Sequence, residues 1–330
     1  MLPASASVIG INSVRRWQRR LRHGENTSAK RWQPMTPLTA TQDLRTRVLL
    51  LGAGDRENVQ LEAERLRPVI RKSAEIVLDD LESRADLSEV SADFAIVLGG
   101  DGSILRAAKR MHHNQIPVIG INLGKLGFLA DLLPDELIAA WPDVCAGQYT
   151  IVEHLMLECS IMRGEQTIAC QLGLNEMSIQ GGPPYSIMDL ELYVDAELAT
   201  TYSCDGLIIS TPVGSTAHNL SAGGPILRKD LQAFVIAAIS PHTLTVRPVI
   251  DSAERTYEIV VRDPHANTSV VVDGQPLCRL TAEDRVRVVR AAPRFKLVEV
   301  AGHNYYRTLR EKLGWGGNLR EIDAAKRKRR

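Results

Sequence analysis

FAIVLGGDGSILRAAKRM, residues 94–111, joins an apolar run to an amphipathic one through a glycine-rich turn. Phe94–Leu98 predicts a buried strand, and Ile104–Met111 has the apolar spacing of a helix. The turn Gly99–Ser103 therefore lies where a strand ends and a helix begins. Strands that alternate with helices in this way are typical of α/β proteins with a parallel sheet.

The flanking residues extend the same alternation. Val59, Ala63, Leu66 and Ile70 follow one another in steps of four, three and four, which predicts a helix that Pro68 would kink or end early. We therefore predict a doubly wound, Rossmann-like α/β domain over residues 46–148. Its further strands are predicted at Arg47–Leu51, Glu75–Leu78 and Pro117–Ile121.

After residue 148 the pattern changes to short runs of strand type separated by turn residues. Helical spacing is present only near Leu231–Ala238. This pattern predicts a β-rich domain over residues 149–302, an antiparallel β-sandwich-like fold. Its strands are predicted at Tyr149–Met162, Ser178–Gln180, Met188–Val194, Gly206–Ser210, Thr256–Val261, Thr268–Val272, Val286–Val289 and Lys296–Val300.

Both ends of the chain are basic. Residues 1–42 contain seven Lys or Arg against one acid, Glu25, and the chain closes on KRKRR. An Arg-rich, acid-poor start is compatible with an organelle transit peptide. We favour a disordered extension over residues 1–45, or an upstream start codon with the working protein beginning near Met35. The tail at residues 321–330 is predicted to be solvated rather than a nucleic-acid patch.

The composition excludes several classes of protein. A formal net charge of +1 gives no reason to expect nucleic acid or an anionic membrane as a partner. No apolar run approaches the roughly 20 residues that cross a bilayer. The five cysteines are odd in number and none share a C-x-x-C spacing, which argues against a disulfide framework or a zinc site. We therefore predict a cytoplasmic protein with no metal site of its own.

The glycine-rich turn is the strongest chemical signal. Its glycines let the backbone approach a ligand closely, and the N-terminus of the following helix favours phosphate. Asp101 would repel a phosphate, so its presence indicates that it holds a metal or accepts a proton from an attacking hydroxyl. The alternative is a purely structural Asp-Gly turn. The spacings of a dinucleotide-binding fingerprint and of a P-loop are both absent.

Three further segments suit a nucleotide. DGLIISTPVGSTAHNLSAGGP, residues 205–225, runs from a buried strand into a long loop of glycines and hydroxyls. Asn175-Glu176 offers a donor, an acceptor and a carboxylate to a ribose diol, although the pair alone is a weak signal. Asp273-Gly274-Gln275 is typical of a hairpin turn, and its default interpretation is structural.

Together these segments closely resemble the NAD kinase family over about residues 46–317. The glycine turn, LGFLAD at 126–131, the Asn-Glu pair, the long loop ending SAGGP, PHTLTVRP at 241–248 and YYRTLREKLGW at 305–315 occur in the family's order. The resemblance implies a kinase that phosphorylates the adenosine-ribose 2′-hydroxyl of NAD to make NADP. It also implies that residues 303–320 pack back on the first domain, and that the chain forms a homodimer or homotetramer.

The resemblance implies a role for each matching residue. Asp101 would be the general base, and Mg²⁺ would travel with the phosphates of ATP or polyphosphate. The donor's phosphates would lie against Gly99, Gly100, Gly102 and Ser103. The implied NAD-binding residues are Asp101, Gly102, Asn175, Glu176, Ser186, Asp205, Thr216, Ala217, His218, Asn219, Leu220, Ser221 and Gln275.

Three departures and three rival functions remain at this point. Ser103 stands where the family commonly has Thr, which keeps the hydroxyl. Val213 and His218 stand where the family usually has Thr and Tyr, which could shift affinity or the preference between NAD and NADH. A sugar kinase or a lipid kinase could use the same glycine turn, but no TIDND-like segment follows it and no signal of a lipid-sized pocket is present. A sensor that binds NAD or NADP without turnover would not need Asp101.

Overall fold

The computed structural model describes residues 45–54, 56–183, 187–300 and 305–314. The predicted tail at 321–330, and all of the predicted N-terminal extension except Arg45, lie outside these residues. The described residues form three six-stranded sheets. No helix among them is long and apolar enough to cross a membrane.

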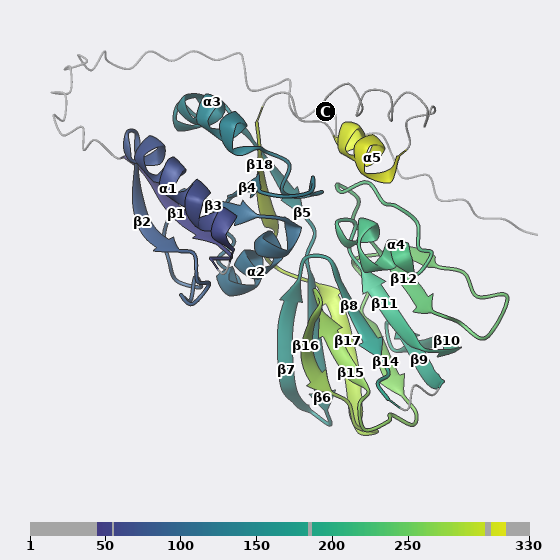
Figure 1. The fold of residues 1–330 in the computed structure, drawn as a ribbon. Helices are drawn as coiled ribbons and strands as arrows, with labels where there is room; N and C mark the ends of the chain where they lie inside the picture. Colours follow the sequence, from purple (N-terminus) through teal and green to yellow (C-terminus); the bar gives the residue numbers. More distant parts are fainter. Residues whose placement is uncertain (1–44, 55, 184–186, 301–304, 315–330) are drawn as a thin grey trace, which may run out of the picture. The chain divides into compact units, whose positions relative to one another are not determined.

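The first sheet lies in the N-terminal α/β half and has the strand order β2-β1-β3-β4-β18-β5 (Figure 1). All its neighbouring strands are parallel except β18 and β5. Every residue of β3 and β4 is buried, as expected for strands covered on both faces. The strands are β1 (Thr46–Gly52), β2 (Ala74–Asp80), β3 (Phe94–Gly99), β4 (Val118–Asn122), β5 (Thr150–His154) and β18 (Phe295–Glu299).

Helices cover both faces of this sheet. Helices α1 (Glu57–Arg71) and α3 (Pro134–Cys145) share an apolar cluster with one face, and α2 (Asp101–Met111) packs on the other. The doubly wound arrangement predicted from the sequence is therefore confirmed. Helix α1 buries the four residues at the predicted spacing, and it continues past Pro68, which is exposed near its C-terminal end.

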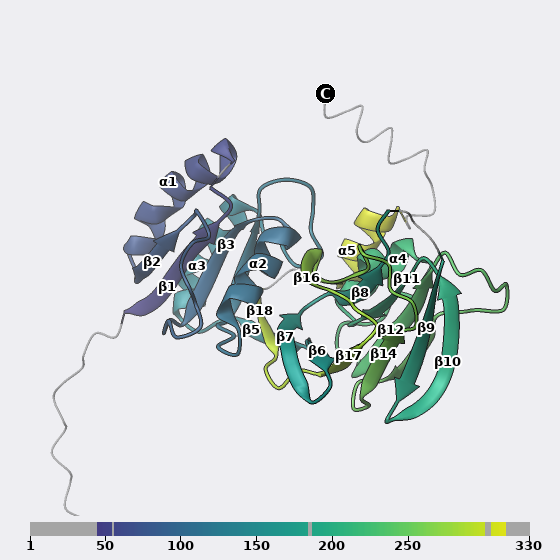
Figure 2. The same ribbon diagram turned by 90° about the horizontal axis from the view of Figure 1, so that it is seen from below.

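The second half is a sandwich of two antiparallel sheets around one apolar core, as predicted (Figure 2). One sheet has the order β10-β9-β14-β17-β6-β7, and the other has the order β13-β12-β11-β8-β15-β16. The strands of the first are β6 (Leu157–Arg163), β7 (Gln166–Gly173), β9 (Met188–Val194), β10 (Glu197–Cys204), β14 (Tyr257–Val261) and β17 (Asp284–Arg290). Those of the second are β8 (Glu176–Gln180), β11 (Gly206–Ser210), β12 (Ala233–Ile239), β13 (Val249–Ser252), β15 (Ser269–Val272) and β16 (Gln275–Arg279).

The helical spacing near Leu231–Ala238 was misleading. This segment contains β12, which pairs with β11 on one side and β13 on the other. Residues 234–238 are buried on both faces, so they form a continuous apolar run without the alternation of a half-exposed strand. Periodicity alone cannot distinguish such a run from a buried helix.

The run predicted as one strand at Tyr149–Met162 is two strands in different sheets. β5 ends at His154 and pairs with β18 in the first sheet, whereas β6 begins at Leu157 in the sandwich. Both β5 and β18 come from the part of the sequence that was assigned to the β-rich domain. The length and the composition of a short strand do not identify the sheet in which it pairs.

An apolar cluster also connects the two halves. Ile104 and Ala107 on α2 belong to the same buried cluster as Leu172, Leu174 and Val213 from the sandwich half. Leu174 immediately precedes the Asn-Glu pair, and Val213 lies at the start of the long loop. The cluster therefore fixes both segments relative to α2. Val213 is 3% exposed, so its apolar side chain contributes to packing.

Candidate active site

The glycine turn presents the N-terminus of α2. β3 ends at Gly99, whose φ of +140° is in the region that favours glycine, and a Cβ there would meet Ser103 Oγ at 2.3 Å. By contrast, a Cβ on Gly100 or Gly102 would meet no atom within 4 Å. The space beside these two glycines is therefore open, and a ligand can approach the backbone N–H groups at the start of α2.

The Asp101 carboxylate is held by three backbone donors. Oδ2 accepts from the N–H of Phe128 at 2.8 Å, and Oδ1 accepts from Leu129 at 2.9 Å and Ala130 at 3.0 Å. A Cβ on Gly127 would lie 2.2 Å from Oδ1, so only glycine leaves room for the carboxylate. The LGFLAD segment, which entered the sequence analysis only as a family feature, is thus the cradle of Asp101.

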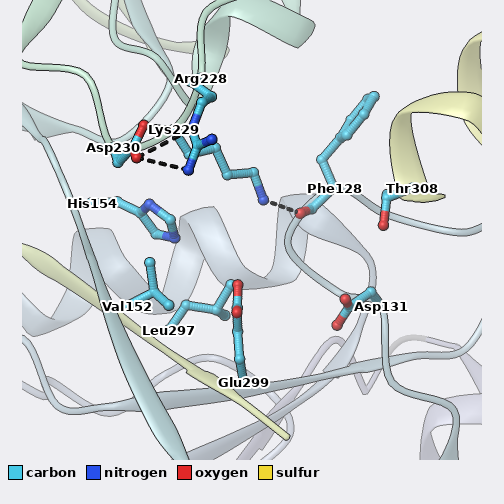
Figure 3. Close-up of a pocket in the computed structure, with 10 residues that line it drawn as sticks. All are labelled: Phe128, Asp131, Val152, His154, Arg228, Lys229, Asp230, Leu297, Glu299 and Thr308. Carbon is cyan, nitrogen blue, oxygen red and sulfur yellow. Dashed lines mark hydrogen bonds and ion pairs between the residues drawn. The ribbon is translucent and has the colours of Figure 1, made fainter. Parts of the chain in front are cut away.

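Two lysines approach this cradle. Lys312 Nζ, on helix α5 (Tyr305–Leu313), lies 3.9 Å from Asp101 Oδ2 and 4.2 Å from the centroid of the Phe128 ring. Lys229 Nζ donates to the Phe128 carbonyl at 2.6 Å (Figure 3). Burial lowers the pKa of both lysines, and the charge of Asp101 opposes that shift. The sequence analysis identified neither lysine as a site residue.

Two further carboxylates, Asp273 and Glu176, lie close together where β8 begins. Asp273 accepts from the N–H groups of Leu174 at 2.8 Å, Asn175 at 2.7 Å and Glu176 at 3.1 Å. Burial, and then the charge of Asp273, raises the pKa of Glu176 to about 8, while the N–H of His218 opposes the shift. Glu176 Oε2 is buried with no hydrogen-bond partner among the described residues. The turn at Asp273-Gly274-Gln275, which was interpreted as structural, therefore holds the backbone of the Asn175-Glu176 pair in place.

The long loop is locked against the same strand. Thr211 N–H donates to the Asn175 carbonyl at 2.8 Å, and Thr211 Oγ1 donates to the Leu174 carbonyl at 2.6 Å. Gly214 packs so closely that a Cβ would lie 2.1 Å from the Asn175 carbonyl oxygen. The loop then forms the short helices η1 (Gly214–Thr216) and α4 (His218–Ser221). Asn175, Glu176 and the start of the loop are therefore one packed unit.

Within this unit the predicted residues differ in exposure. Thr216, Ala217, His218 and Leu220 are half-buried, and Ser221 is exposed. Asn219 is fully buried, and its Nδ2 donates to the carbonyls of Ser215 and Pro225 at 3.2 and 3.1 Å. Both amide protons of Asn219 are thus used to close the loop.

The remaining predicted residues lie apart from Glu176. β11 pairs with β8 so that Ser210 is opposite Glu176 and Gly206 is opposite Gln180. Asp205, just before Gly206, therefore lies at the other end of β11, roughly 15 Å away at the rise of a strand. Asp205 is exposed and lies 3.8 Å from His242 Nε2. Gln275 is exposed at the start of β16, and Ser186 lies outside the described residues.

A cavity of about 230 Å³ adjoins the Asp101 cradle (Figure 3). His154 lines it and is fully buried, with neither ring nitrogen hydrogen-bonded to a described residue. Burial and the charge of Lys229 lower the pKa of His154 to about 3. The other lining residues are Phe128, Asp131, Val152, Arg228, Lys229, Asp230, Leu297, Glu299 and Thr308. Among the described residues, no cluster of three or more His, Cys, Asp or Glu could hold a metal ion.

Comparison with known proteins gives one family. Models of the ATP-NAD kinase N-terminal and C-terminal domains match residues 38–149 and 174–300. An NAD kinase of Rhodopirellula baltica is 55% identical over 273 residues, which cover 83% of this chain and 88% of the relative. An NAD kinase of Azotobacter vinelandii is 40% identical over 241 residues, covering 72% and 81% of the two chains.

Two solved structures share the fold. Yeast NADH kinase, complexed with NADH, has a TM-score of 0.72 at 22% identity, covering 84% of this chain and 89% of the yeast chain. An NAD kinase from Archaeoglobus fulgidus, in complex with ATP, has a TM-score of 0.66 at 24% identity, covering 81% and 98%. At these identities the likeness concerns the fold.

The glycine turn and the cradled aspartate between a doubly wound α/β domain and a β-sandwich form a site that suits the phosphates of a nucleotide, and the matching family models are those of kinases, a class of phosphotransferase. The family models and the curated relatives make the assignment specific. The chain belongs to the NAD kinase family.

Proposed function

We propose that this chain phosphorylates the 2′-hydroxyl of the adenosine ribose of NAD and so makes NADP. The observation that carries the proposal is the cradle of Asp101, which holds a partly exposed carboxylate at the N-terminus of α2, beside two open glycines. The names of the curated relatives support the choice of NAD as acceptor. The ATP and NADH named for the two solved structures support a site that accepts both nucleotides.

In this proposal Asp101 accepts the proton of the 2′-hydroxyl while the oxygen attacks the terminal phosphorus of the donor. The new bond is between the 2′-oxygen and phosphorus, and the bond from phosphorus to the donor's bridging oxygen breaks. Phosphoryl transfer depends mainly on alignment and charge stabilisation. A carboxylate fixed in place suits that requirement.

The donor's phosphates would lie on the open glycine turn. Gly100 and Gly102 leave space for them, and the N-terminus of α2 favours phosphate. Mg²⁺ bound with the donor would neutralise charge on the phosphates, with their oxygens as its main ligands. The proposal leaves ATP and polyphosphate as alternative donors.

The acceptor nucleotide would lie against the packed unit of β8 and the long loop. The unpartnered Oε2 of Glu176 is placed to bond a ribose hydroxyl, and Asn175 is next to it. Thr216 to Ser221 would line the adenosine side. Asp205 lies about a strand length away from Glu176. The contact of Asp205 with NAD that the resemblance implies therefore requires an extended dinucleotide or a second copy of the chain, in the proposed homodimer or homotetramer.

The proposed compartment is the cytoplasm. All five cysteines are free thiols, and Cys159 and Cys204 among them are buried. A chain with free thiols suits a reducing compartment.

The test is a coupled assay. Purified protein, NAD, ATP and Mg²⁺ are mixed, and NADP is measured with an NADP-specific dehydrogenase, beside the Asp101→Asn variant. The Asn oxygen can keep the bonds from Leu129 and Ala130, so the variant should fold and bind NAD. We expect it to lose about 100-fold or more in turnover. Asp135→Asn, an 86% exposed carboxylate on α3, is the matched control.

Each outcome is informative. NADP from the wild type and from Asp135→Asn, with almost none from Asp101→Asn, supports the reaction and its base. Retained turnover in Asp101→Asn removes Asp101 from that role. A folded wild type that binds NAD but forms no NADP with ATP or polyphosphate indicates the nucleotide-sensor function instead.

A further inference from the structure

One peptide group separates a lysine from the proposed base. The carbonyl of Phe128 accepts from Lys229 Nζ at 2.6 Å, and the N–H of the same peptide group, on Leu129, donates to Asp101 Oδ1 at 2.9 Å. The carbonyl and the N–H of a trans peptide point in opposite directions, so the two charges lie on opposite sides of it. The ammonium, the peptide and the carboxylate thus form one chain of hydrogen bonds.

Such a chain strengthens its own members. A cation on the carbonyl polarises the peptide and makes its N–H a better donor, and a carboxylate on the N–H acts in the same sense. Lys229 also interacts electrostatically with Asp101. Both effects hold the carboxylate in one orientation.

The contact of Lys229 with Phe128 joins two segments that lie far apart in the sequence. Lys229 follows the long loop in the sequence, whereas Phe128 belongs to the α/β half, 101 residues earlier. Figure 3 shows its side chain extended along the cavity toward the Phe128 carbonyl. The contact therefore ties the sandwich half directly to the segment that holds Asp101.

We propose that Lys229 is a positioning residue for the phosphoryl transfer, which acts on Asp101 through the Phe128–Leu129 peptide group. The inference rests on the proposed function, because it assigns Asp101 the role of base. Nothing in this role requires Lys229 to touch NAD or the donor. Its charge and its hydrogen bond would set the orientation of the base.

Other charged groups also face Lys229 and must be considered in a pH experiment. They lie on each of the elements packed around it: Asp101 on α2, Asp131 after the cradle, His154 on β5, Glu299 on β18 and Lys312 on α5, with Arg228 and Asp230 on its own segment. These groups remain in a Lys229 variant, but loss of the Lys229 charge also removes one of the two causes that lower the pKa of His154.

The test compares Lys229→Met, Lys229→Gln and Lys229→Arg with the wild type in the NADP assay across about pH 5.5 to 9. Met removes the charge and the hydrogen bond, Gln keeps a donor without charge, and Arg keeps the charge. We expect kcat to fall about 10-fold in Lys229→Met, with the KM for NAD nearly unchanged. The acid side of its kcat profile should move to higher pH, because the variant loses a positive charge beside the reacting groups.

Lys229→Arg should restore both kcat and the acid side of the profile. If Lys229→Met does not fold, Lys229→Gln carries the test, since loss of the charge alone should still move the profile. Lys72→Met, at an exposed lysine at the C-terminal end of α1, is the matched control and should behave as wild type.

Wild-type kcat and pH profile in the folded Met or Gln variant would overturn the inference. So would a loss of activity in which the acid side does not move, because that result indicates only a structural role. A wild type that makes no NADP is a different failure, which belongs to the proposed function.

Discussion

The ammonium of Lys312 lies 3.9 Å from the carboxylate of Asp101, across 211 residues of sequence. The same ammonium lies over the ring of Phe128, whose N–H donates to that carboxylate. Helix α5 therefore contacts the cradle of the proposed base at two points. Helix α5 therefore places a positive charge beside the carboxylate of Asp101.

We expect Lys312→Met to lower kcat by about 10-fold, because the variant loses a positive charge beside the reacting groups. The effect on stability should be small, since partly exposed ion pairs contribute about 1 kcal/mol or less. The measurement is kcat in the NADP assay together with the thermal unfolding midpoint. Arg310→Met, an exposed cation on the same helix, is the control and should match the wild type in both.

Gly102 and Gly127 both lie near Asp101, but only Gly102 borders open space. Substitutions at these two positions therefore separate an effect on ligand binding from an effect on packing. Gly102→Ala places a methyl group in open space and replaces glycine in a helix, so stability should be unchanged or rise by up to about 1 kcal/mol. Activity should nevertheless fall, because the methyl group occupies the space proposed for the ligand. The unfolding midpoint and kcat/KM for NAD and for the donor measure the two effects. An Ala variant with wild-type kcat/KM would show that no ligand approaches Gly102.

The contrasting change is Gly127→Ala. Its Cβ would lie 2.2 Å from Asp101 Oδ1, and the Ala130 carbonyl oxygen is 2.6 Å away, so the cradle must shift. We expect a destabilisation of about 1–3 kcal/mol, as for overpacking, and a large loss of kcat. Wild-type kcat in this variant would mean that the cradle geometry is not needed for turnover.

The fold was largely predictable because its strongest signals are local. The turn at Gly99–Ser103 and the apolar spacing of α1 depend only on neighbouring residues, and both predicted the α/β half. The partners of a strand depend on distant residues. For this reason the pattern alone assigned β5 and β18 to the β-rich domain, although both strands pair in the first sheet. β12 was mistaken for a helix because burial on both faces removes the alternation of a strand.

The candidate site was predictable only in part, for the same reason. Asp101 and Glu176 stand in recognisable local motifs. Lys229 and Lys312 do not, because what gives them meaning is contact with the Phe128 segment, 101 and 184 residues away. The turn at Asp273 has an ordinary hairpin sequence, and only the folded chain shows its carboxylate on the backbone of residues 174–176.

The raised pKa of Glu176 predicts how stability depends on pH. With a pKa of about 8 in the folded protein and about 4.5 unfolded, Glu176 keeps a proton over an interval in which the unfolded chain has lost it. The folded state binds more protons there, so the wild type loses stability as the pH rises from about 4.5 to about 8. Glu176→Gln has no proton to lose and should avoid this loss.

Thermal unfolding of wild type and Glu176→Gln at about pH 5, 7 and 9 measures the effect. The variant's midpoint should rise relative to the wild type as the pH increases, by roughly 2–4 °C for each kcal/mol of burial cost relieved. Glu153→Gln, an exposed carboxylate on β5, controls for the loss of any one carboxylate. A constant difference between wild type and Glu176→Gln at all three pH values would mean that Glu176 is ionised in the folded protein. Water or a bound ligand would then have to donate a hydrogen bond to the buried Oε2 of Glu176.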